Sequence, residues 1–261
     1  VNPGLQILRS FHHTDPWVQS VACHINWGDF VLGVLGVYLP TITHLLKRGL
    51  SVQDQWAHVQ TQVEFVQRGT DFFVFMGDCN AWLGELHTPL PVSPSLPPWA
   101  MSPPSSSFPI HNAAGLAMHE TLQFCDLTPL TGLHPHDLPA GPSYFGPRGH
   151  SRIDHVAVSP SLLTCVSSSL PLNDFSFMDH LPVICDLAPP PDLHPPSPSP
   201  FSSLPRIQWD PGLQDIQQAV NHGAQALDLT RRRSSGGTKH DKIWRMLFKL
   251  HAAACQPLLP C

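Results

Sequence analysis

The stretch Asp71–Asn80, DFFVFMGDCN, joins a continuous apolar run of strand length to a polar end, Gly77-Asp78-Cys79-Asn80. Such a run is typical of a buried strand that ends in a loop at the rim of a sheet. Polar side chains in that loop then face outward at the rim. By itself, a Gly-Asp-x-Asn tetrapeptide is a structural turn more often than a catalytic one. Its meaning therefore depends on the sequence around it.

Two strands are expected before this stretch. Trp17–Ile25 and Phe30–Tyr38 are rich in valine, leucine and aromatic residues, and the segment Asn26-Trp27-Gly28-Asp29 separates them. This pattern predicts two strands joined by a tight turn, of which the second is central in its sheet.

A helix is expected from about Ser51 to Arg68. Apolar residues recur there at steps of four and three, which places on one helix face Val52, Trp56, Val59, Val63 and Val66. Ser51 and Asp54 form a start signal that resembles a capping box, and Gly69 lies where a helix-ending glycine belongs.

The chain after the proline-rich stretch 89–109 continues to mix helix and strand signals. The spacing of Leu116, His119, Leu122 and Cys125 indicates a short helix. Three later segments are predicted as strands: Arg152–Ser159, Thr164–Ser168 and Pro182–Leu187. The sequence therefore predicts a mixed α and β domain over residues 1–188.

The composition changes after this domain. Residues 189–207 are proline-rich and show no packing pattern, which predicts an extended linker. Residues 208–261 are expected to form a helical tail, with amphipathic helices at 212–228 and 240–254. Between these helices lies the basic run Arg231-Arg232-Arg233, which is usually a solvated face and otherwise a phosphate contact.

Charge and cysteine usage narrow the class of protein. The 261 residues carry a net charge of -5, so no global basic face argues for nucleic-acid binding. The seven cysteines are scattered and form no CxxC pair, which indicates neither a disulfide framework nor a zinc site. Phe30–Pro40, the longest apolar run, is too short to span a bilayer. We expect an intracellular, soluble protein without a membrane partner, cytoplasmic or nuclear.

Histidines are numerous, with 17 in the chain. His12-His13 and His134-Pro-His136 could suggest metal binding. Their scatter among prolines favours surface loops instead.

Three polar clusters lie at the ends of three apolar strands: Gly77-Asp78-Cys79-Asn80, Ser151-Arg152-Ile153-Asp154-His155 and Met178-Asp179-His180-Leu181-Pro182. Hydrolysis of a phosphodiester needs a cation that neutralises charge on the phosphoryl oxygens, a base that deprotonates the attacking water, and hydrogen-bond donors that hold the phosphate in place. Carboxylates, an amide and an imidazole can supply these functions. Singly, however, Asp154 could be a buried hydrogen-bonded carboxylate, and Asp179-His180 a helix cap or loop pair.

The order of these clusters resembles a known family. FFVFMGDCNA, SRIDHVAVS and MDHLPV look like the GDFN, SxIDY and SDHxP motifs of the endonuclease/exonuclease/phosphatase superfamily, and GVYLP at 36–40 is similar to its YxP. The resemblance covers about residues 5–188. It implies an α+β fold: a two-sheet β-sandwich flanked by helices, four-layered like deoxyribonuclease I, here with its first strands missing.

The resemblance also implies roles for the matching residues. Asp78 would polarise or deprotonate the attacking water, and Asn80 would position that water and the phosphate. His180 would contact the scissile phosphate. Asp154 would orient His180 and hold its charge, as a histidine donor or base needs. Tyr38 would steady the phosphate.

The implied cofactor is magnesium, or manganese, with Asp179 as its ligand, since such hard cations prefer carboxylate oxygen and keep several waters. The family's first strands also carry an Asn and a metal-binding Glu, and nothing before Tyr38 matches either. The first glutamate is Glu64, on the predicted helix. We therefore expect an N-terminally truncated fragment with weak or no activity. Three motif positions depart from the usual Phe, Tyr and Ser: Cys79, His155 and Met178.

The flanks favour one branch of the family. Asn112, Gly115, Leu122, Phe124-Cys125 and Leu127 resemble the N-x-x-G-x-x-L-x-x-F-C segment of non-LTR (LINE-like) retrotransposon endonucleases, and the tail resembles the linker to a reverse transcriptase. The resemblance thus implies DNA as substrate, nicked through its phosphate backbone, and a reverse transcriptase in the same polyprotein. Two alternatives stay open: a cellular phosphoesterase acting on a phospholipid or phosphoinositide, and a non-catalytic remnant.

Overall fold

A computed structural model describes residues 5–86, 90, 94–147, 149–172 and 179–189 of the chain. Its centre is a six-stranded sheet in the order β1-β2-β3-β4-β8-β5. The strands of this sheet are β1 (Leu5–Thr14), β2 (Gln19–Trp27), β3 (Phe30–Tyr38), β4 (Phe72–Asp78), β5 (Thr128–Pro129) and β8 (Asp154–Val158). Two-stranded sheets are formed by β6 (Tyr144–Gly146) with β7 (Gly149–Ser151) and by β9 (Val166–Pro171) with β10 (Val183–Leu187).

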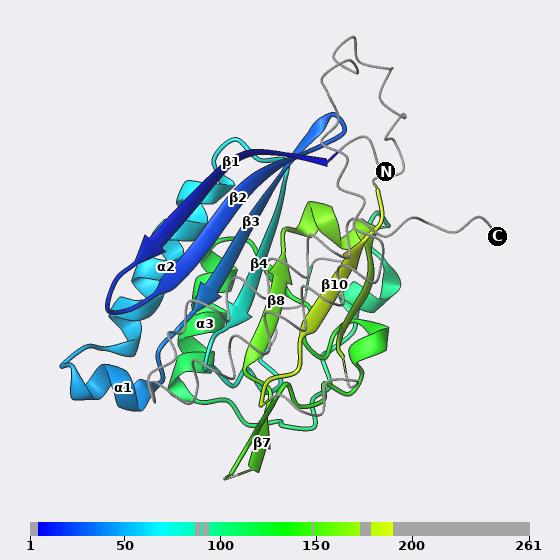
Figure 1. The fold of residues 1–261 in the computed structure, drawn as a ribbon. Coiled ribbons are helices and arrows are strands. Elements are labelled where there is room, and N and C mark those ends of the chain that lie inside the picture. The colour runs from blue at the N-terminus through cyan, green and yellow to red at the C-terminus, as the bar shows by residue number, and fades with distance from the viewer. Residues whose placement is uncertain (1–4, 87–89, 91–93, 148, 173–178, 190–261) are drawn as a thin grey trace, which may run out of the picture.

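Helices α2 (Val52–Gln67) and α3 (Ala113–Phe124) cover one face of the large sheet, and α1 (Ile42–Lys47) lies beyond the ends of its strands (Figure 1). The described residues also contain short 3-10 turns at Pro98–Met101, Pro135–Asp137 and Pro160–Cys165. The predicted apolar stripe of α2 is buried, and it shares one core with Phe73, Phe75 and the inner side of α3. This core fixes the helical layer on the sheet because apolar area removed from water is the main stabilising term.

The ends of α2 are set by local chemistry, as the sequence predicts. The backbone N–H of Asp54 donates to Ser51 Oγ at 3.0 Å, while Ser51 Oγ donates to Asp54 Oδ2 at 2.6 Å. Gly69 has φ +79, a left-handed conformation that favours glycine after a helix.

The β9–β10 pair packs against the opposite face of the large sheet next to β8 (Figure 1). A second core lies between them, in which Val74, Met76 and Val156 of the sheet pack with Cys165 and Val166, and Val183 packs against it. The mixed α+β class is therefore confirmed. The second layer of the expected sandwich consists of two strands in the described residues.

Most predicted elements are present, with some differences. Strands Phe30–Tyr38 and Pro182–Leu187 and both domain helices are confirmed within a few residues. The expected strand Thr164–Ser168 instead starts as a 3-10 turn and becomes β9 only at Val166. Neither β1 nor α1 was predicted from the sequence. The proline-rich linker, apart from Pro189, and the helical tail lie outside the described residues.

The described helices include none that is long and apolar enough to cross a membrane. The five cysteines in the described part of the chain are free thiols, which agrees with their scattered spacing.

Candidate active site

Strand register brings the first two motifs to one rim of the large sheet. Because β3 and β4 run parallel with Tyr38 opposite Asp78, both residues end their strands at the same level. Strand β8 runs antiparallel to β4 and pairs Asp154 with Asp78. Directly opposed residues project to the same face of a sheet, so the two carboxylates belong to one site.

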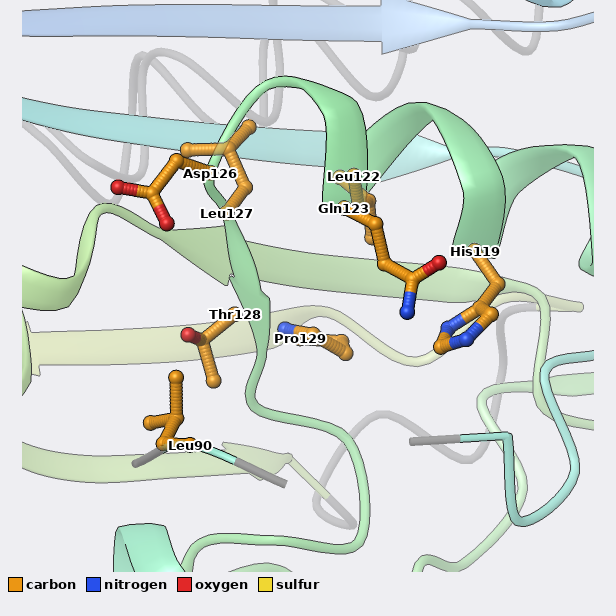
Figure 2. Close-up of a pocket in the computed structure, with 8 residues that line it drawn as sticks. All are labelled: Leu90, His119, Leu122, Gln123, Asp126, Leu127, Thr128 and Pro129. Atoms are coloured by element: carbon orange, nitrogen blue, oxygen red, sulfur yellow. The ribbon is translucent and has the colours of Figure 1, made fainter. Parts of the chain in front are cut away.

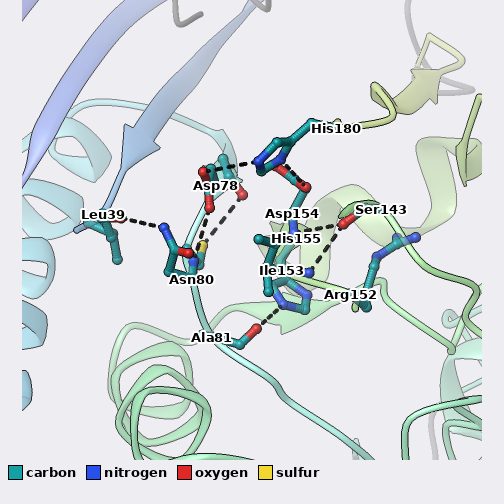
Figure 3. Close-up of polar contacts among 12 residues, drawn as sticks. Leu39, Asp78, Asn80, Ala81, Ser143, Arg152, Ile153, Asp154, His155 and His180 are labelled. Carbon is teal, nitrogen blue, oxygen red and sulfur yellow. Dashed lines mark hydrogen bonds and ion pairs between the residues drawn. The ribbon is translucent and has the colours of Figure 1, made fainter. Parts of the chain in front are cut away.

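The third motif adds an imidazole to these carboxylates. His180 Nδ1 donates to the Asp154 carboxylate, at 2.9 Å from Oδ2 and 3.2 Å from Oδ1. Its Nε2 faces Asp78, 3.8 Å from Oδ2. Figure 3 shows the His180 ring between the two acids. Asp78, Asp154 and His180 therefore converge in the structure, with side chains 10 to 23 % exposed.

Asn80 holds the loop that carries Asp78. Its backbone N–H donates to Asp78 Oδ1 at 3.2 Å, and its Nδ2 donates to the carbonyl of Leu39 at 2.8 Å. The residue has φ +46, and asparagine tolerates this left-handed region better than most residues. Asn80 thus lies next to the acids, and its side-chain nitrogen is hydrogen-bonded to the backbone of Leu39.

Ser143 supports the backbone next to both Asp154 and His180, and its role was not predicted from the sequence. The Oγ atom of this fully buried serine accepts the backbone N–H groups of Ile153 at 3.2 Å and Asp154 at 3.1 Å. Its carbonyl accepts the N–H of Leu181 at 2.7 Å. One residue therefore fixes the start of β8 and the segment that carries His180 (Figure 3).

The neighbouring Tyr144 contacts the imidazole itself. Tyr144 forms an antiparallel bridge with His180, and the two ring centroids lie 4.9 Å apart. The backbone N–H of Phe145 donates to the carbonyl of Asp179 at 2.7 Å. Strand β6 therefore orients the His180 segment, a contact that only tertiary structure reveals.

Arg152 anchors the loop that leads to Ser143, because its Nη1 donates to the carbonyl of Gly141 at 3.4 Å. Its Nη2 lies 2.9 Å from Asp137 Oδ2, and both side chains are buried. Burial raises the pKa of Asp137, and the attraction of Arg152 opposes that rise. Burial likewise lowers the pKa of Arg152, opposed by Asp137 and Asp154. The pair is a structural support beneath the rim.

His155 is neutral and structural. Its Nε2 donates to the carbonyl of Ala81 at 2.9 Å, and Thr131 Oγ1 lies 2.9 Å from its Nδ1. Burial is the main reason why the pKa of this imidazole falls to about 3. His155, in place of the family's tyrosine, thus ties β8 to the residue after Asn80. Burial also holds the pKa of the Cys79 thiol well above its usual range, which leaves no thiolate at the rim.

Two carboxylates and an imidazole form a candidate metal site. One possible ligand atom from each of Asp78, Asp154 and His180 lies within 4.8 Å of the other two, the one such group among the described residues. Two carboxylate oxygens with space for water suit a hard divalent cation. The glutamates Glu64, Glu85 and Glu120 lie outside this group.

Asp179 and Tyr38 are placed less directly. Asp179 is exposed beside His180 and does not belong to the three-residue group, so its role as a metal ligand stays a prediction. Tyr38 is half-buried at the end of β3, beside Asp78 in the sheet, and its contact with phosphate also stays a prediction.

The motif over 111–132 has a structural explanation. Asn112 caps α3 by accepting the N–H of Gly115 at 2.7 Å, and the same Oδ1 accepts the N–H of Trp82 at 3.1 Å. A Cβ at Gly115 would meet the carbonyl oxygen of Trp82 at 1.8 Å. Helix α3 therefore packs backbone to backbone against the chain that leaves Asn80, which explains the Asn and Gly of this motif.

No family model matches the sequence, and no curated protein matches it either. Solved structures do show similarity. A 3'-5' exonuclease from Neisseria meningitidis is 17% identical over 70% of this chain and 72% of its own, with a TM-score of 0.48. The endonuclease domain of TRAS1, a telomere-specific non-LTR retrotransposon, is 16% identical over 69% and 68%, with a TM-score of 0.42. An endonuclease/exonuclease/phosphatase family protein from Bacteroides thetaiotaomicron is 15% identical over 70% and 64%, with a TM-score of 0.44. Members of that family are thus among the solved structures to which this chain is similar.

Proposed function

We propose that this chain is the phosphodiester-cleaving module of a divalent-metal-dependent endonuclease of the LINE-like retrotransposon type, which nicks DNA. The observation that carries the proposal is the Asp154–His180 hydrogen bond at 2.9 Å with Asp78 on the other side of the imidazole. Paired carboxylates around one imidazole provide a base, a proton donor and cation ligands within a single half-buried cluster.

The residues divide the chemistry between them. Asp154 fixes the tautomer of His180 by accepting from Nδ1, so that Nε2 is the atom presented to a phosphate. Asp78 Oδ1 accepts the N–H of Asn80, and Oδ2 faces the imidazole, 3.8 Å from His180 Nε2. Asp78 and Asp154 would hold a magnesium or manganese ion, with Asp179 as a further candidate ligand. When bound, the ion would neutralise charge on the phosphoryl oxygens.

In this proposal the site contacts DNA through its phosphate backbone. A reverse transcriptase would belong to the same polyprotein. The free cysteines support an intracellular location, cytoplasmic or nuclear. In this proposal the chain itself has weak or no activity, because none of its glutamates belongs to the ligand group.

The test is nicking of supercoiled plasmid with Mg²⁺ or Mn²⁺, using Asp154→Asn and His180→Asn. Each variant is expected to lose at least about a hundredfold in rate, the typical contribution of a positioned acid or base. Asp126→Asn is the matched control, because Asp126 is exposed in a separate hollow of about 120 Å³ (Figure 2) and asparagine tolerates its φ of +53.

A parallel assay on a short-chain phosphoinositide separates the alternative substrate class. Cleavage of the phosphoinositide without plasmid nicking would favour the lipid phosphoesterase. A folded chain that cleaves neither substrate would favour the non-catalytic remnant.

A further inference from the structure

A second group of potential metal ligands lies between the β1–β2 turn and α2. Asp15, in the turn, places Oδ2 at 2.9 Å from Nε2 of His13 on β1 and at 3.3 Å from Nδ1 of His58 on α2. The sequence offered His12-His13 only as a weak metal signal, because the histidines are scattered among prolines. The fold supplies two, from 2 and 45 residues further along.

Two of the three side chains are held in place. Asp15 Oδ1 accepts the backbone N–H groups of Trp17 and Val18, both at 2.7 Å, which fixes the carboxylate and leaves Oδ2 for the histidines. The His58 ring stacks on the indole of Trp17, with centroids 4.3 Å apart and an interplanar angle of 14°.

Two of the three ligand separations fit a tetrahedral ion. Two ligand atoms at about 2.1 Å from one zinc ion lie about 3.4 Å apart, and the two oxygen-to-nitrogen separations, 2.9 and 3.3 Å, are near this value. The third separation, between the two imidazole nitrogens, is longer than 4.8 Å, because among the described residues that limit is met by the Asp78–Asp154–His180 group alone. Zinc binding would therefore require the His13 ring, which is 51% exposed, to turn.

We propose that His13, Asp15 and His58 form a site for a borderline transition-metal ion such as zinc, which ties the β1–β2 hairpin to α2. Imidazole nitrogens favour zinc over magnesium, so the ion class differs from that expected at the rim. The two rings line a surface hollow of about 310 Å³ with Ala57, Thr61 and Gln62, which leaves room for a water as fourth ligand. The site does not depend on the proposed nuclease activity.

The test is titration of the full chain with ZnCl₂ by calorimetry in excess MgCl₂. The variants are His13→Gln, His58→Gln and the double variant, with His111→Gln as a control that removes another exposed histidine. Asp78→Asn with His180→Asn removes the rim group and isolates the second site. We expect this background to bind one zinc, and each single variant in it to bind at least about tenfold more weakly, the loss that even a supporting residue causes.

Thermal unfolding gives a second readout, because a ligand that binds only the folded state raises the melting temperature. In the Asp78→Asn/His180→Asn background, zinc should raise the melting temperature of the His111→Gln control and not that of the double variant, and circular dichroism should show that both are folded. Equal zinc binding by the folded double variant and the control would overturn the proposal. An equal rise in melting temperature with MgCl₂ and with ZnCl₂ at this site would also overturn the proposal.

Discussion

Replacement of Ser143 by alanine tests whether one buried hydroxyl holds the candidate site together. The change removes the acceptor for the backbone N–H groups of Ile153 and Asp154, which lie 3.2 and 3.1 Å from Oγ. Ile153 and Asp154 are 6 and 7% exposed, so water reaches these donors poorly. An unsatisfied buried donor costs about 1 to 3 kcal/mol. Because both bonds are long and share one oxygen, we expect about 2 to 4 kcal/mol in total.

Ser169→Ala is the matched control. Ser169 is 1% exposed, on β9, and its Oγ has no hydrogen-bond partner among the described residues. Removal of an unpartnered buried hydroxyl leaves nothing unsatisfied, so this variant should unfold at the same denaturant concentration as the parent or slightly higher. Both variants delete the same atom from a buried serine.

The assay is urea unfolding of both variants, followed by circular dichroism at neutral pH. The free energy of unfolding should fall by about 2 to 4 kcal/mol for Ser143→Ala and should not fall for Ser169→Ala. Plasmid nicking by Ser143→Ala should also fall, under conditions where the variant is folded, because Asp154 and His180 lose a shared support. The reasoning is refuted if Ser143→Ala is no less stable than Ser169→Ala.

Three further outcomes follow from buried groups. The pKa of His155 is about 3 in the folded state and 6.5 ordinarily, so the unfolded chain binds the proton first and the free energy of unfolding falls as the pH drops below 6.5. This histidine alone should lower the free energy of unfolding by about 2 kcal/mol at pH 5. His155→Gln should remove this part of the pH dependence, measured by urea unfolding. Gly115→Ala should cost about 1 to 3 kcal/mol in the same measurement, because its Cβ meets the Trp82 carbonyl, whereas Gly141→Ala, with nothing within 4 Å, should not. Arg152→Met should cost about 3 to 5 kcal/mol by leaving the Asp137 carboxylate buried and unpaired, and adding Asp137→Leu should recover part of that loss.

Local signals explain why some elements were predictable. Helix α2 was predicted closely because its apolar stripe, its serine cap and its final glycine are all encoded within 19 residues of sequence, Ser51–Gly69. Strand β4 was predictable because its apolar run stops at the rim. In these elements the local preference and the tertiary contact agree, so the sequence pattern alone suffices.

Strand β1 was missed for the opposite reason. Its sequence, LQILRSFHHT, lacks the regular alternation of a half-buried strand, and Ile7 and Leu8 are 60 and 51% exposed. Its pairing with β2 contains a register shift between Ile7 and Arg9. The strand exists because β2 provides a partner, a tertiary effect that overrides a weak local pattern.

Some residues of the candidate site were likewise predictable from the sequence, and others were not. Asp78, Asp154 and His180 were found because each lies in a motif at one end of an apolar strand: Asp78 ends β4, Asp154 begins β8, and His180 precedes β10. Strand register and the Asp154–His180 hydrogen bond then bring them together. Ser143 and Tyr144 were missed because neither stands in a motif, and their contacts reach residues 8 to 38 positions away. A hydrogen-bond partner at such separations leaves no periodic signal in the sequence.

The two carboxylates at the rim, Asp78 and Asp154, lower the stability of the fold unless a cation lies near them. Ligand atoms of Asp78 and Asp154 lie within 4.8 Å of each other. Two unit charges at that separation repel by about 3 kcal/mol at an effective dielectric constant of about 20. Hydrophobic residues would avoid this cost, and a single carboxylate would suffice to orient His180. Instead, the backbone N–H of Asn80 donates to Asp78 Oδ1, and Ser143 Oγ fixes the backbone of Asp154, so both acids are held at the rim. A rigid pair of repelling carboxylates is favourable only when a cation, either bound metal or protonated His180, lies between them. That requirement is the physical reason to expect the Asp78–Asp154 cluster to gain stability on binding a divalent ion.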